Sequence, residues 1–256
     1  MVYKYFSPNE YNLVALQNGY FWFSKRKYLN DPFDMAGSVV NEFPNFVKYL
    51  KERRLDVDGY DVLLDKYAVC CFSERWNNNQ MWGTYADSYK GWCLEFDDSL
   101  ELLDQGYCID KNLYPVQYLL KFPDLDNTET VLRDFKAELD MADDVEIALS
   151  GLKSFDDKKL DALFRYLLLV KQIKWAYEEE KRIIIGKQGL LGCCVNDKGC
   201  RIQWNKKSFK SVTIGHNIDE KYEELVKEMA RQHGVTVYKT KVGRVIDFSL
   251  KRELIS

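Results

Sequence analysis

Residues 175–186 constrain the fold most, because charged side chains lead directly into an apolar strand. The three isoleucines at 183–185 predict a strand that is buried on both faces. If that strand begins near Glu178, its period of two places Glu178, Glu180 and Arg182 on one face. Buried charges are costly unless they are paired. The segment therefore predicts either an Arg182–Glu180 ion pair at the mouth of a core strand or a polar cleft that uses one carboxylate.

The remaining apolar segments predict one α+β domain over residues 1–256. Residues 124–174 carry apolar positions at helical spacing among charged ones, which predicts a helical insertion between strands. Closely spaced strands at both ends of the chain favour a mainly antiparallel mixed sheet, either continuous or split in two. Ser7 and Asn217 are expected to cap two of the helices. The expected strands are residues 2–6, 20–24, 67–73, 90–96, 114–118, 183–185, 202–204, 212–215, 235–238 and 244–248.

Composition limits the classes of protein to consider. The net charge of −3 provides no global attraction to nucleic acid or to an anionic membrane. Seven cysteines without a C-x-x-C pattern predict free thiols in a reducing cytoplasm. No segment resembles a signal peptide or a membrane span. No metal site is expected, since the zinc spacing rules fit none of Cys193, Cys194, Cys200 and His216.

Polar and aromatic side chains gather in segments next to the expected strand ends. Residues 30–34 have the chemistry of a tight turn, because short polar side chains bond back to the backbone and proline fixes φ. The aspartates of this turn are suited to hold a ligand hydroxyl. The alternative is that the turn is structural and the aromatic residues belong to the core. Since ligand sites form near strand ends, the sequence predicts a pocket wall made of Asn30, Asp31, Asp34, Ser73, Trp82 and Tyr85.

Five segments together carry a resemblance to a known family. They are residues 3–5, 22–34, 71–74, 81–91 and 175–182. In this order they resemble a bacterial family described only as domain of unknown function 2971 (DUF2971). The resemblance runs from near the N-terminus to about Gly215, and the family description implies no activity.

A more distant likeness is to the ADP-ribosyltransferase superfamily. Its members have an early strand with His, Arg or Tyr and then an aromatic strand that ends in Ser. A late strand is entered through Glu-x-Glu or Gln-x-Glu, whose second Glu is catalytic. In this chain Lys4 or Tyr5 corresponds to the first position, and Ser24 to the second, with Ser73 competing for it. The chain departs from the pattern in having no His in the first strand and no Ser-Thr-Ser triplet.

The superfamily likeness implies an enzyme that consumes NAD as its nucleotide substrate, in a defence or toxin-like setting. Glu180 is then the catalytic carboxylate, with Glu178 and Arg182 beside it. Cleavage of the nicotinamide–ribose bond builds positive charge on the ribose, which a fixed carboxylate stabilises. The acceptor is left open between protein and nucleic acid. The residues expected to bind NAD are Lys4, Tyr5, Ser24, Asn30, Asp31, Asp34, Ser73, Trp82 and Tyr85.

Two other functions stay open at this point. The first is a metal-dependent nuclease, in which Glu179 with Lys181, or Glu180 with Arg182, lies beside Asp31 or Asp34 and the carboxylates hold Mg²⁺. The second is a non-catalytic ligand-binding or interaction domain, in which the same polar residues are structural. Neither GxGxxG nor a Walker A loop occurs, which disfavours hydride transfer and P-loop chemistry.

Overall fold

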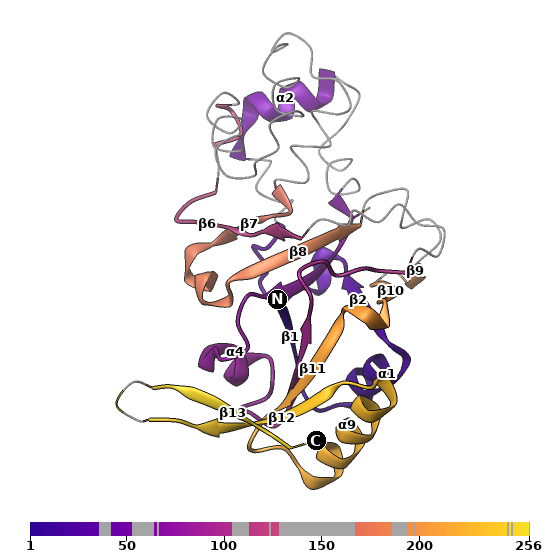
Figure 1. Ribbon diagram of the computed structural model, residues 1–256. Coiled ribbons are helices and arrows are strands. Elements are labelled where there is room, and N and C mark those ends of the chain that lie inside the picture. The colour runs from indigo at the N-terminus through magenta and orange to yellow at the C-terminus, as the bar shows by residue number, and fades with distance from the viewer. Residues whose placement is uncertain are drawn as a thin grey trace.

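The computed structural model describes residues 1–35, 42–52, 64–65, 67–103, 113–122, 124–127, 167–185, 194–196, 198–244, 246 and 248–255. Within these residues the chain is α+β, with a largely antiparallel sheet and a small number of helices (Figure 1). This confirms the predicted α+β class with a mainly antiparallel sheet. The helical insertion predicted at 124–174 lies for the most part outside the described residues.

Strands dominate the described part of the chain. Those of the main sheet are β1 (Val2–Phe6), β2 (Tyr20–Ser24), β3 (Ala68–Ser73), β4 (Trp92–Phe96), β5 (Tyr114–Pro115), β8 (Glu180–Ile185), β9 (Cys194–Asn196), β10 (Gly199–Gln203), β11 (Phe209–Ile214), β12 (Thr236–Val242) and β13 (Leu250–Leu254). A separate parallel pair consists of β6 (Gln117–Leu119) and β7 (Val170–Gln172). The main sheet follows the order β13-β12-β11-β4-β1-β3-β2-β10-β9, and β8 joins β3 and β5 outside this path. In the main sheet β11 and β12 pair in parallel, whereas the other pairs described are antiparallel.

The sheet divides at β3, and this division positions the site. All six residues of β3 pair with β8. By contrast, β3 meets β1 at one residue pair, Tyr3 with Ser73, and meets β2 at another, Ser24 with Val69. Beyond these points β1 continues along β4, while β2 continues along β10. The ends of β1, β3 and β8 are thereby brought together at Ser73.

The described part of the chain has four helices, and two of them have N-caps other than those predicted. They are α1 (Glu10–Asn18), α2 (Pro44–Glu52), α4 (Asn79–Thr84) and α9 (Glu220–His233), with 3-10 turns η1 (Arg26–Tyr28), η3 (Ile173–Glu178) and η4 (Lys206–Ser208). The N-cap of α1 is Asn9 instead of Ser7, because the Asn9 side chain accepts from the Asn12 N–H at 2.9 Å. The N-cap of α9 is Asp219 instead of Asn217. Both caps directly precede the first helical residue, where the free backbone N–H groups are.

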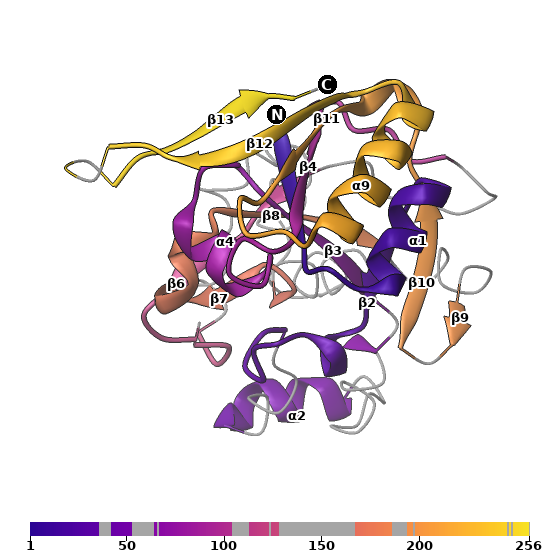
Figure 2. The same ribbon diagram turned by 90° about the horizontal axis from the view of Figure 1, so that it is seen from below.

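Helices α1 and α9 lie side by side over one part of the sheet (Figure 2). Their apolar residues, including Leu16 and Val226, join Phe21 and Phe23 of β2 in the largest core cluster. On another side of the sheet, α4 covers Tyr3 and Tyr5 of β1. No helix in the described ranges combines the length and the apolar character needed to cross a membrane.

Candidate active site

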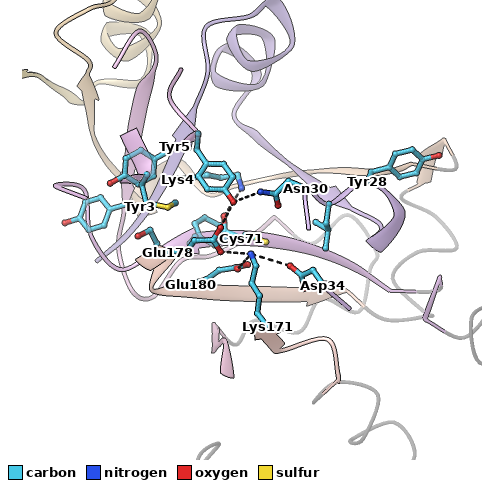
Figure 3. Close-up of a pocket in the computed structure, with 15 residues that line it drawn as sticks. Tyr3, Lys4, Tyr5, Tyr28, Asn30, Asp34, Cys71, Lys171, Glu178 and Glu180 are labelled. Carbon is cyan, nitrogen blue, oxygen red and sulfur yellow. Dashed lines mark hydrogen bonds and ion pairs between the residues drawn. The ribbon is translucent and has the colours of Figure 1, made fainter. Parts of the chain in front are cut away.

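A pocket with a volume of about 270 Å³ lies where β1, β3 and β8 come together (Figure 3). This volume is just below the range of roughly 300–1,000 Å³ that is usual for small-molecule sites. The side chains come from β1, the η1 turn and the loop after it, β3, α4, β7, η3 and β8. They are Tyr3, Lys4, Tyr5, Tyr28, Leu29, Asn30, Asp34, Cys71, Phe72, Ser73, Met81, Tyr85, Lys171, Glu178 and Glu180.

Three carboxylates and two cations form one buried cluster beside the pocket. The Lys171 ammonium donates to Glu178, lies 3.1 Å from Glu180 Oε2 and lies 3.4 Å from Asp34 Oδ2. The Arg182 guanidinium contacts Glu180 through Nε at 2.6 Å and binds both oxygens of Asp34 at 2.8 and 2.6 Å. All five residues are at most 5% exposed. Because each charge has an opposite partner and hydrogen bonds, burial is sustainable here.

The balance of charges in this cluster gives the two glutamates different pKa values. Burial acts to raise the pKa of Glu180, but Arg182 and Lys171 outweigh burial and hold that pKa well below its usual value. Burial raises the pKa of Glu178 to about 7, because the lowering effect of Lys171 is smaller and Glu180 adds to the rise. Two cations thus neutralise two carboxylates, and Glu178 carries the surplus charge. At neutral pH Glu180 is ionised, whereas Glu178 is poised to exchange a proton.

Tyr85 connects Glu178 to the turn after η1. The Tyr85 hydroxyl donates to Glu178 Oε1 and accepts from the Asn30 side-chain amide at 2.8 Å. Burial raises the pKa of Tyr85, and Glu178 raises it further, so the hydroxyl stays protonated. It is therefore a fixed donor to Glu178. Asn30, Tyr85 and Glu178 are brought together from the turn after η1, the C-cap of α4 and η3.

The backbone places Glu178 and Glu180 differently from the sequence prediction. The strand begins at Glu180, and Glu178 is the last residue of the 3-10 turn η3. Between them Glu179 has φ of 44°, in the left-handed region. This conformation is uncommon for a residue other than glycine. Glu178 therefore reaches the pocket from η3, whereas Glu180 reaches it as the first residue of β8, on the same strand as Arg182.

The structure brings eight of the twelve predicted site residues to the pocket. They are Lys4, Tyr5, Asn30, Asp34, Ser73, Tyr85, Glu178 and Glu180. Ser73, and not Ser24, is the serine that lines it. Ser73 pairs with Tyr3 of β1 and with Glu180 of β8, which fixes it at the junction of the three strands.

The other four predicted residues do not line the pocket. Ser24 lies at the far end of β3, beside Val69. The side chain of Asp31 is turned to its own loop and accepts from the Phe33 N–H at 2.9 Å. Trp82 is fully buried in the core, where its indole N–H donates to the Trp76 carbonyl at 2.7 Å. Arg182 has no exposed surface, because it lies behind Asp34 and Glu180.

Lys171 is the charged lining residue that sequence reasoning missed. It lies in β7, within the segment that was interpreted as a helical insertion. Charge balance provided a signal, because three buried carboxylates with one arginine require another cation. Among the described residues, no group of three or more His, Cys, Asp or Glu side chains is arranged to hold a metal ion. The pocket carboxylates instead hold Lys171 and Arg182.

Comparison with known families supports the resemblance inferred from the sequence. Residues 81–183 match the family described as "Protein of unknown function (DUF2971)". The matched segment runs from α4 to β8 and contains Tyr85, Lys171, Glu178, Glu180 and Arg182. Neither the curated proteins nor the solved structures contain a match to the chain. The family match therefore covers the part of the site that holds both glutamates, and its description names no activity.

Proposed function

We propose that the pocket binds NAD and cleaves the bond between nicotinamide and ribose, in the manner of an ADP-ribosyltransferase. One observation carries the proposal. Lys4 and Tyr5 of β1, Ser73 of β3 and Glu180 of β8 line one pocket from strands that are neighbours in the sheet. These are the residue types, in the chain order, on which the superfamily likeness rests, with Ser73 in the serine position.

The reaction makes the nicotinamide neutral and leaves positive charge on the ribose ring. Glu180 stabilises that charge, because its pKa is held low and the carboxylate is ionised. Its oxygens are fixed by Arg182 and Lys171, so little reorganisation is needed when the charge develops. The rings of Tyr5 and Phe72 line the same space and provide apolar walls for the nicotinamide.

Glu178 has a different role in this proposal. With a pKa of about 7 it is partly ionised at neutral pH and accepts the proton of the attacking acceptor group. A general base of this kind contributes roughly 10²–10⁴ to the rate. The volume of about 270 Å³ suits the nicotinamide–ribose end of the dinucleotide. The rest of NAD then extends outward beside Tyr28 and Asn30, which are exposed.

The proposal includes a cytoplasmic location and a defence or toxin-like role. Cys70, Cys71 and Cys93 are free thiols, which suits a reducing compartment. An enzyme that consumes NAD in that compartment removes a cofactor on which the cell depends, and this is the basis for a toxin-like effect.

The test is nicotinamide release from NAD by the purified protein. Glu180→Gln removes the charge and is expected to lower release by about 10²-fold or more. It also weakens the buried pairs with Arg182 and Lys171, so its melting temperature is expected to fall. The matched control is Asp34→Asn, which weakens pairs to the same two cations but removes a carboxylate to which the proposal gives no role in the chemical step.

Both variants are assayed below their melting temperatures, so that unfolding does not enter the comparison. The proposal expects a large loss of release in Glu180→Gln and a small one in Asp34→Asn. Equal losses would assign Glu180 a structural role. A wild type that binds NAD but releases no nicotinamide would make the pocket a ligand-binding site, which is the non-catalytic alternative.

A further inference from the structure

A strip of aromatic and basic side chains runs along β2 and β10 toward the pocket. We call it the β2–β10 strip, and its members are Tyr20, Trp22, Lys27, Tyr28, Lys198 and Arg201. The antiparallel register pairs Trp22 with Arg201 and Tyr20 with Gln203. The alternate residues of β2, Phe21 and Phe23, face the core and are at most 1% exposed. The period of the strand therefore puts the strip on the face of β2 that is turned away from this core.

Rings and cations alternate along the strip. The Arg201 guanidinium lies 5.2 Å from the centre of the Tyr20 ring, and the Lys198 ammonium lies 5.6 Å from the centre of the Tyr28 ring. Trp22 lies across Gly199, where a Cβ would approach the indole to 3.0 Å. Lys198, Arg201 and Tyr28 are exposed, Tyr28 to 48%. Tyr20 is buried and Trp22 is half-buried, whereas Tyr28 and the three cations Lys27, Lys198 and Arg201 form the exposed part of the strip.

The strip leads to the pocket through Tyr28. The Lys25 N–H donates to the Lys198 carbonyl at 3.0 Å, which holds the end of β10 against the start of η1. Tyr28 ends η1, and Tyr28 and Asn30 both line the pocket (Figure 3). Tyr28 is thus a member of the strip and of the pocket at once.

The local charge of the strip is opposite to the net charge of the chain. Lys25 and Arg26 add to its three cations, and Asp65 pairs with Arg26 at 2.9 Å and with Lys27 at 2.8 Å. This concentration of positive charge occurs in a chain whose net charge is −3. Net charge alone argued against nucleic acid, but a local basic surface is what contacts phosphates.

We propose that single-stranded nucleic acid binds along the β2–β10 strip and that its nucleotide at the pocket mouth is the acceptor of the ADP-ribosyl group. Phosphates lie on Lys198, Arg201 and Lys27, while bases stack on Trp22 and Tyr28. A positive groove with aromatic rings is how proteins bind single strands without sequence preference, since every base has a π-face. In a duplex the base faces are already stacked, so only the phosphate contacts are available.

The acceptor role rests on the proposed function, whereas binding along the strip does not. In the transfer step the bond between the ribose carbon and the nicotinamide nitrogen breaks, and nicotinamide leaves as a neutral molecule. The same carbon forms a bond to a nitrogen or oxygen of the acceptor nucleotide, and the proton of that atom passes to Glu178. Atoms and charge balance without an oxidant, a reductant or a further reactant.

The binding test uses fluorescence anisotropy of a labelled short oligothymidylate, titrated at several salt concentrations without NAD. The double variant Lys198→Ala/Arg201→Ala removes two phosphate contacts and is expected to make the slope of log affinity against log salt shallower by about 1.4. Lys221→Ala/Lys251→Ala removes the same charge from two exposed positions outside the strip and is the matched control. Tyr28→Ala is expected to weaken binding by roughly 5- to 150-fold, the effect of losing one stacked base.

Three results would overturn binding along the strip: no oligothymidylate binding by the wild type, equal weakening in the control pair, or equal affinity for a duplex of the same length. The acceptor role is tested with NAD labelled in its adenylate half. The acceptor role is overturned if nicotinamide is released but the labelled ADP-ribosyl group is never found on the oligonucleotide. The proposed function is overturned if the protein releases no nicotinamide under any condition. The oligothymidylate binding result does not depend on that outcome, because binding is measured without NAD.

Discussion

Replacing Glu178 by Gln is expected to change the stability of the protein and its rate of nicotinamide release in opposite directions. Glu178 is the surplus carboxylate beside Lys171 and Arg182, and its pKa is raised from 4.5 to about 7. Between these two pH values the folded protein holds a proton that the unfolded chain has lost. The free energy of unfolding therefore falls as pH rises through this window, by about 3 kcal/mol for this one group. Above pH 7 the loss is complete.

The Glu178→Gln variant cannot ionise at this position, so its stability lacks this fall. As pH rises from 4.5 to 7, the free energy of unfolding of the variant is therefore expected to increase by about 3 kcal/mol relative to that of the wild type. Its amide oxygen still accepts from the Tyr85 hydroxyl, which keeps the local packing. Nicotinamide release, by contrast, is expected to fall by about 10²-fold or more, because the proton acceptor is gone.

The assay is urea unfolding at pH 5 and pH 8, together with nicotinamide release at both values. Reversible unfolding gives the free energy at each pH by linear extrapolation. The reasoning is refuted if the wild type loses no stability over this range relative to Glu178→Gln. It is refuted on the chemical side if the variant releases nicotinamide as fast as the wild type does.

Two further substitutions test the same cluster. Lys171→Met leaves three carboxylates with Arg182 as their cation in the cluster. The free energy of unfolding, measured in urea, is expected to fall by about 3–5 kcal/mol, which is the usual effect of breaking a buried ion pair. An unchanged urea midpoint would contradict this. Tyr85→Phe removes a hydrogen bond that lowers the pKa of Glu178, so the midpoint of the pH–rate profile is expected to move upward, and a profile that does not move argues against Glu178 as the titrating base.

The strands near the N-terminus were readable from the sequence because their side chains are β-branched, aromatic or continuously apolar. The predictions at 2–6, 20–24 and 67–73 agree with β1, β2 and β3 to within one residue. Of the strand predicted at 244–248, residues 244, 246 and 248 are described and none of them lies in a strand; the pairing starts at Leu250. The Gly243 N–H donates to the Ser249 carbonyl at 2.9 Å, which brings the two sides of the predicted segment together. This backbone contact overrode the intrinsic strand preference of the apolar residues.

The site was readable in part, for reasons that follow from chain geometry. Ser73 and Glu180 were predicted from their positions at strand ends, and the cross-strand pair between them confirms that these ends meet. The left-handed backbone at Glu179 has no sequence signal, so the placement of Glu178 in η3 was not predictable. Lys171 reaches the cluster through contacts to Asp34, Glu178 and Glu180, which depend on how β7, η3 and β8 pack, and the spacing of residues does not report such contacts.

A crystal structure of the protein soaked with NAD tests the central claim most directly. The account predicts electron density for the nicotinamide–ribose end in the pocket, with the ribose carbon facing Glu180 and the dinucleotide leaving past Tyr28. The account is contradicted if NAD binds elsewhere and leaves this pocket empty. A divalent ion bound by Asp34 and Glu180 in place of Lys171 would contradict it as well, since that arrangement belongs to the nuclease alternative.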